Sequence, residues 1–168
     1  GYWSRGLGDV YKRQVLGGYF AESQGFEKEV CLAVSEHYLP SGLNSRTPKN
    51  NYSIALSLSD KLDTLVGFFG LDLIPTSSKD PYALRRMAIG LIKLIIENKK
   101  SFKLKEMIDY SCQLYNNQSI NFDGKSVHTN LSIFIIDRLK NYMKEKGIRL
   151  DIIESSLIAV SYTHLRAH

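Results

Sequence analysis

Apolar side chains that recur every three or four residues limit the folds open to this chain more than any other feature of its sequence. In residues 51–69 the recurring positions form one helical face. They are Ile54, Leu58, Leu62, Leu65 and Phe69. Similar spacing occurs in 27–38, 81–97, 103–115 and 131–143. No segment alternates apolar and polar residues as a half-buried strand does. We therefore predict an all-α fold, a bundle of helices.

Turn and capping residues predict where the first of these helices begin and end. The stretch LPSGLNSRTPKN (39–50) is rich in Pro, Gly, Ser and Asn, which favours a loop. Asp80 and Pro81 form a start signal, because Asp accepts the free N–H groups at an N-cap and Pro fits the first helical position. The helix that they open should cover about 81–97 and be largely buried, since it is apolar around much of its circumference. Gly90, in its middle, predicts close approach of a neighbouring helix.

The second half of the chain repeats the pattern. The helix at 103–115 should face inward with Leu104, Ile108 and Cys112. NNQSINFDGKS (116–126) is predicted to be a polar loop, and Gly147 should close the long helix after it. The inward positions of that long helix are Leu131, Phe134, Ile135, Leu139, Tyr142 and Met143. Asp151 and Glu154 have the spacing of a capping box and predict one more helix.

The two ends of the chain differ from the rest. The whole sequence has a net charge of +5, but residues 1–14 contribute +2 and residues 161–168 contribute +1, which leaves +2 for 15–160. Neither end shows helical or strand periodicity or the apolar segment of a signal peptide. Both resemble translated sequencing-adaptor ends, and we expect them to be non-native and dispensable. The first methionine is Met87, so we expect the sequence to be part of a longer chain.

Composition favours a cytoplasmic protein without a membrane-spanning segment. The content of 43% hydrophobic and 23% charged residues is ordinary for a globular protein. The longest aliphatic run, 89–96, contains a lysine and is far shorter than a membrane span. Cys31 and Cys112 have no metal-binding spacing, and both are expected to be reduced thiols in the core.

One histidine and one aspartate suggest a metal site without completing it. EHYLPSGLNS followed by SLSDKLDTL resembles the second half of the HD-type phosphohydrolase pattern, with Asp60 at the position of its last aspartate. The His-Asp pair that this pattern requires is absent, and His37 with Asp60 supplies too few ligands for a divalent ion. We expect no metal here and treat both residues as degenerate HD-like positions. Asp60 and Asp63 also share a helical face, although such exposed pairs are usually only solvated. An active phosphohydrolase fragment stays open as an alternative.

Three basic residues are candidates for contact with RNA. Arg86 and Lys93 are seven residues apart and fall on one helical face, with Arg85 beside them. The alternative is that these side chains form ion pairs with Asp60 or Asp63 of the preceding helix. No phosphate-binding loop, dinucleotide-binding motif or zinc-ligand spacing is present, so we expect no catalytic residue in this chain.

Three long stretches resemble one protein family. They are EHYLP (36–40), ALSLSDKLDTLVGFFGLDLIPTSSKDPYALRRMAIGLIKLI (55–95) and IFIIDRLKNYMKEKGIRLDIIESSLIAV (133–160). All three look very like the beta subunit of the bacterial heterotetrameric glycyl-tRNA synthetase. GGYFAESQG (17–25) fits the family less closely. The resemblance covers about 15–160 and stops abruptly at both terminal strings.

The resemblance implies an enzyme of two alpha and two beta subunits that joins glycine to its tRNA. It implies that ATP, glycine and magnesium bind the alpha subunit, and that this part of the beta subunit binds no cofactor. The implied partners are the alpha subunit, the tRNA for glycine and a second beta subunit. Residues 15–78 would form a degenerate HD-like region, and 79–160 a helical region that leads to an anticodon-binding domain. A helical module that only holds the alpha subunit, without RNA contact, remains a competing interpretation.

Overall fold

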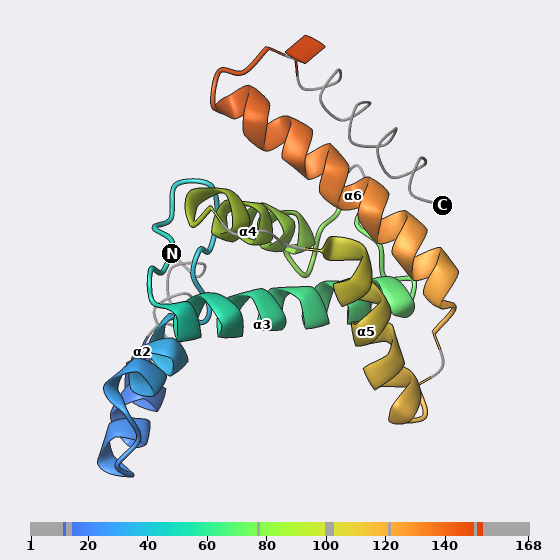
Figure 1. Ribbon diagram of the computed structural model, residues 1–168. Helices are drawn as coiled ribbons and strands as arrows, with labels where there is room; N and C mark the ends of the chain where they lie inside the picture. The colour runs from blue at the N-terminus through green and yellow to red at the C-terminus, as the bar shows by residue number, and fades with distance from the viewer. Residues whose placement is uncertain are drawn as a thin grey trace.

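The computed structural model describes residues 12, 15–76, 78–99, 103–120, 122–149 and 151–152, and all regular structure in these residues is helical. Residues 15–23 are helical and precede the five labelled helices (Figure 1). These are α2 (Lys28–Glu36), α3 (Asn51–Gly70), α4 (Leu84–Glu97), α5 (Leu104–Asn117) and α6 (Gly124–Glu145). The predicted all-α fold is confirmed. No helix in the described ranges is long and apolar enough to cross a membrane.

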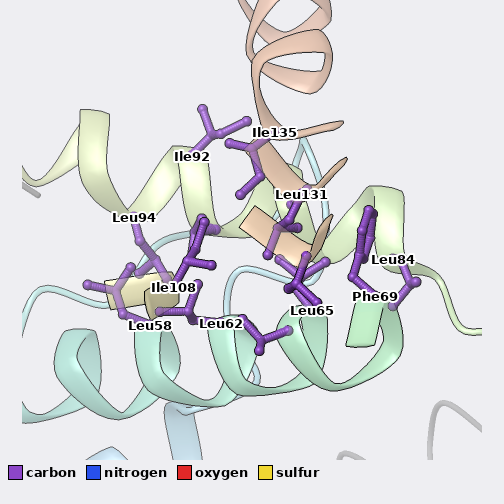
Figure 2. Packing of buried hydrophobic residues seen from close by; sticks show 14 of the residues in the cluster. Leu58, Leu62, Leu65, Phe69, Leu84, Ile92, Leu94, Ile108, Leu131 and Ile135 are labelled. Atoms are coloured by element: carbon purple, nitrogen blue, oxygen red, sulfur yellow. The ribbon is translucent and has the colours of Figure 1, made fainter. Parts of the chain in front are cut away.

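Helix α3 is the centre of the bundle. It packs against α2, α4, α5 and α6, and α6 also packs on α4 and α5. The Asn50 side chain caps α3 by accepting a hydrogen bond from the Tyr52 N–H at 2.7 Å. All five residues of the face predicted from the sequence are buried. Figure 2 shows four of them, Leu58, Leu62, Leu65 and Phe69, directed toward Leu84 and Leu94 of α4, Ile108 of α5, and Leu131 and Ile135 of α6.

The start of α4 differs from the prediction. The helix begins at Leu84, three residues after Pro81, and its N-cap is Ala83 in the left-handed conformation with φ of 58°. Asp80 still caps the helix, but from further away. One oxygen of its carboxylate accepts the N–H of Leu84 at 2.8 Å and the other accepts the N–H of Arg85 at 3.0 Å. The sequence therefore identified the capping residue and misplaced the first turn.

The two-oxygen cap predicts different costs for two substitutions. Asp80→Ala removes both acceptors and should lower the free energy of unfolding by about 2 kcal/mol. Asp80→Asn keeps one oxygen and places an NH₂ group against the second N–H, so we expect about half that loss. Urea unfolding measures both. Asp123 is the matched control, because this N-cap of α6 accepts only the Lys125 N–H, at 3.2 Å, and Asp123→Asn should cost almost nothing. Equal stability of Asp80→Asn and the wild type would contradict the two-oxygen cap.

The connection between α5 and α6 is shorter and more apolar than expected. Helix α5 continues to Asn117 and α6 starts at Gly124, so the connection is 118–123. It contains Phe122, a core residue only 9% exposed. The Phe122 ring fills the space over Gly70, where an added Cβ would lie 2.5 Å from three ring atoms. The prediction of a polar loop missed this core residue, because one aromatic side chain in a polar stretch gives no periodic signal.

The inward face of α6 agrees with the prediction. Leu131, Ile135 and Tyr142 are buried, and the other three predicted positions are partly buried against the core. Gly147 follows the helix with φ of 80°, a conformation that favours glycine and ends the helix. Asp151 lies in a helical residue pair, and its carboxylate accepts two hydrogen bonds from the Arg149 guanidinium. Glu154 and the terminal strings 1–14 and 161–168, apart from Lys12, lie outside the described residues.

The two cysteines occupy different environments. Cys112 is buried in the core, and burial raises the pKa of its thiol. Cys31 is half-exposed, and its thiol donates to the carbonyl oxygen of Phe26 at 3.5 Å. The expectation of two core thiols therefore holds for Cys112 and is wrong for Cys31, because α2 lies at the edge of the bundle and packs on α3 alone among the labelled helices.

Candidate functional site

A pocket of about 190 Å³ lies where the turn after α2, the middle of α3 and the first turn of α4 meet. Its lining residues are Tyr38, Pro40, Ser41, Asp60, Lys61, Ala83, Arg86 and Met87. It thus brings together Asp60 and Arg86, which the sequence had suggested for two different kinds of site. Both of these side chains are exposed.

The buried side chain of Lys61 lines this pocket. Lys61 is 3% exposed, and its Nζ lies 2.9 Å from Ser57 Oγ and 3.2 Å from each carbonyl oxygen of residues 37, 38 and 39. These carbonyls follow the end of α2, where the helix dipole favours a positive charge. Burial lowers the pKa of Lys61 to about 8, and the nearby Asp60 carboxylate opposes that shift. Lys61 therefore ties α3 to the turn that forms one wall of the pocket.

Lys93 performs a similar structural task in α4. It is 4% exposed, and its Nζ donates to the carbonyl oxygens of Leu43 at 2.6 Å and Ser45 at 2.5 Å. Glu97 Oε1 lies 3.6 Å from the same nitrogen. A phosphate cannot reach this ammonium while these contacts persist. Seven-residue spacing put Lys93 and Arg86 on one face, but the 39–50 loop encloses Lys93 and leaves Arg86 exposed.

The two arginines of α4, Arg85 and Arg86, also lie in different environments. The Arg85 guanidinium donates to the Thr76 carbonyl and lies 3.8 Å from the Asp80 carboxylate. Its ion pair is therefore with Asp80, and neither Asp60 nor Asp63 takes part. Arg86 has no hydrogen bond or ion pair with any residue that the structure describes, and of the three candidates it is the one exposed to an anionic ligand.

The degenerate HD-like positions do not form a metal centre with other described residues. His37 is half-buried, and its Nδ1 lies 2.7 Å from the Val34 carbonyl oxygen. Among the described residues, no group of three or more His, Cys, Asp or Glu side chains could hold a metal ion.

Asp60 and Asp63 face different hollows. Asp60 lines the pocket with Arg86, whereas Asp63 lines a separate hollow beside Tyr115. The Tyr115 hydroxyl donates to the Asp63 carbonyl oxygen at 3.2 Å. Burial, and then the Asp63 charge, raise the pKa of that tyrosine. The two carboxylates therefore do not act as a pair.

Sequence reasoning missed both buried lysines as structural residues. The sequence of each helix nevertheless contains a signal for its buried lysine. Lys61 falls three residues after Leu58 and four before Leu65, within the apolar stripe of α3, and Lys93 interrupts the run LIKLII. A basic residue at an apolar position of a helix indicates a buried ammonium that needs acceptors from elsewhere in the chain.

Comparison with known proteins identifies the family. Residues 13–158 match the family model described as "Glycyl-tRNA synthetase beta subunit". The chain is 37% identical over 156 residues to the glycine–tRNA ligase beta subunit of Clostridioides difficile (strain 630), with 90% of this chain and 22% of the relative covered. For the protein of the same name from Rhodospirillum centenum (strain ATCC 51521 / SW) the identity is 40% over 141 residues, covering 84% and 19%. The Lactobacillus acidophilus protein is 35% identical over 144 residues, covering 85% and 21%.

The fold and the sequence matches together identify the protein family. The fold and the matches are those of an all-helical segment of an aminoacyl-tRNA synthetase subunit. The chain belongs to the glycyl-tRNA synthetase beta subunit family. It spans about a fifth of the length of the curated relatives it matches.

Proposed function

We propose that this chain is part of a beta subunit that supports tRNA binding and subunit assembly during the ATP-dependent attachment of glycine to its tRNA. The observation that carries the proposal is the family match over residues 13–158. In this proposal catalysis, with ATP and magnesium, takes place on a separate alpha subunit in the cytoplasm. The partners are that alpha subunit, the tRNA for glycine and a second beta subunit. The family match favours this function over the HD-type phosphohydrolase alternative.

Arg86 is the residue of this chain that we assign to tRNA. Its guanidinium is exposed, unpaired within the described residues, and positioned at the rim of a pocket. A guanidinium can grip two phosphate oxygens at once. Arg85 and Lys93 are engaged with other groups of the chain, so they orient the start of α4 and the 39–50 loop around Arg86.

The test compares Arg86→Ala with Lys93→Met in the full-length beta subunit assembled with its alpha subunit. Arg86→Ala should raise the KM for tRNA severalfold and reduce the salt dependence of tRNA binding by about one unit of slope. Glycine activation, measured by pyrophosphate exchange, does not require tRNA contact and should be unchanged. Lys93→Met should instead lower stability by about 2 kcal/mol, because two carbonyls lose their donor, and leave the salt slope unaltered.

Lys105→Ala is the control for loss of one exposed positive charge. Lys105 lies on α5 and is exposed, and it does not line the pocket. It should change neither the KM for tRNA nor the melting temperature. If Arg86→Ala behaves like Lys105→Ala, then Arg86 does not contact tRNA and the RNA role of this segment is wrong.

A further inference from the structure

We propose that the pocket between Asp60 and Arg86 receives one unpaired nucleobase of the bound RNA, with Arg86 donating to an acceptor of the base and Asp60 accepting from its amino group. The inference rests on the proposed tRNA role of this segment and names the chemical group that the site takes. It is carried by three features of the pocket, which are its size, its rigidity and the pairing of one cation with one anion.

The size of the pocket favours a single base. Its volume is about 190 Å³. Pockets for drug-sized ligands usually span about 300–1,000 Å³. The pocket is therefore too small for a whole nucleoside triphosphate, but its volume suits one nucleobase. Pro40, Ala83 and Met87 supply apolar wall, and Tyr38 supplies an aromatic side chain. Unpaired bases are commonly held between such surfaces.

Buried contacts fix the walls in place. The Ser57 hydroxyl donates to the Leu39 carbonyl oxygen, and the Lys61 ammonium donates to the carbonyl oxygens of residues 37–39. On the other side, Asp80 caps the turn that presents Ala83 and Arg86. The pocket is consequently formed before any ligand arrives, which lowers the entropic cost of binding.

The charges at the rim select among ligands. A phosphate inside the pocket would meet the negative Asp60, and a metal ion would meet the positive Arg86. The five N–H donors of the Arg86 guanidinium allow it to contact a backbone phosphate at the rim and still donate to a base. A neutral base with both donors and acceptors suits the two groups together. Neither side chain has a hydrogen-bond partner within the described part of the chain, so both are available. Adenine, cytosine and guanine carry the exocyclic amino group that a carboxylate accepts, and uracil does not.

Dimethyl sulfate footprinting tests the proposal on the assembled enzyme with the tRNA for glycine as the probe. The wild type should protect one unpaired base of the bound tRNA. Asp60→Ala, which removes the acceptor, should restore the reactivity of that base and weaken tRNA binding about tenfold, as expected for loss of a hydrogen bond to a charged group. Asp60→Asn keeps an amide oxygen that can accept from the amino group and should lose less. Because Asp60 is exposed and its charge only partly offsets the burial of Lys61, the melting temperature should fall only slightly. Glu145→Gln, an exposed carboxylate at the end of α6, should leave footprint and affinity unchanged.

Two results would overturn the base pocket. One is identical protection of every base in Asp60→Ala and the wild type. If Arg86→Ala still reduces the salt slope in that case, the proposed tRNA contact holds and only the base pocket is wrong. The other is weaker association of the alpha and beta subunits in Asp60→Asn, measured by sedimentation without tRNA, because it would show that the pocket receives a protein side chain.

Discussion

Gly90→Ala should destabilise the chain by about 2 kcal/mol, although alanine is the better helix former. A Cβ at position 90 would lie 2.7 Å from the Pro40 carbonyl oxygen and 2.9 Å from Lys61 Cε. The carbonyl belongs to backbone that Ser57 and Lys61 hold in place, so it cannot withdraw cheaply. Overpacking of this kind typically costs about 1–3 kcal/mol, occasionally more. It outweighs the gain of about 1 kcal/mol from helix propensity.

Urea unfolding measures the effect, and Gly124→Ala provides the matched control. Gly124 is the first residue of α6, and the nearest atom to its added Cβ is the Cys112 Cβ, at 4.0 Å. That substitution should be neutral or stabilising by up to about 1 kcal/mol. If Gly90→Ala instead raised the free energy of unfolding to the same extent, the close approach of the 39–50 loop to α4 would be wrong.

The sequence had predicted a neighbouring helix at Gly90. The neighbour is instead a loop carbonyl together with one side chain of α3.

Lys61 should make stability rise with pH between about 8 and 10.5. Burial lowers its pKa to about 8 from the ordinary lysine value of 10.5. Below pH 8 both states carry the proton, and the folded state bears the full cost of the buried ammonium. Between the two pKa values the unfolded chain keeps the proton that the folded chain releases, so the free energy of unfolding increases. The full effect is about 3 kcal/mol, at about 1.4 kcal/mol for each pH unit.

The measurement compares the wild type with Lys61→Met at pH 7.5 and pH 9.5. The stability difference between them should move by about 2 kcal/mol in favour of the wild type at the higher pH. The comparison cancels the opposite contributions of Cys112, Tyr115 and Tyr142, whose pKa values are raised by burial and whose effect on stability is lost with rising pH. A pH-independent difference would mean that Lys61 keeps an ordinary pKa in the folded chain.

The sequence alone determined the helices, their buried faces and the family. Apolar spacing is a local property, and a helix converts it directly into a stripe, so the face of α3 and the inward side of α6 could be predicted residue by residue. Gly147 was predictable for the same reason, since a helix end at a residue with positive φ depends on the chain next to it. The long stretches around DKLDTLVGFFG and DPYALRR carried the family resemblance, which the comparisons confirmed.

Only the tertiary structure decided which charged residues are available for binding. Arg86 and Lys93 occupy one face of α4, yet Lys93 is enclosed because carbonyls about 50 residues earlier fold over it. Lys61 is buried because the chain after α2 supplies three more such acceptors. Asp60 and Arg86 meet because α3 and α4 pack together around the 38–41 turn. No local sequence pattern predicts these long-range contacts, because the acceptors that stabilise a buried ammonium lie far away in the sequence.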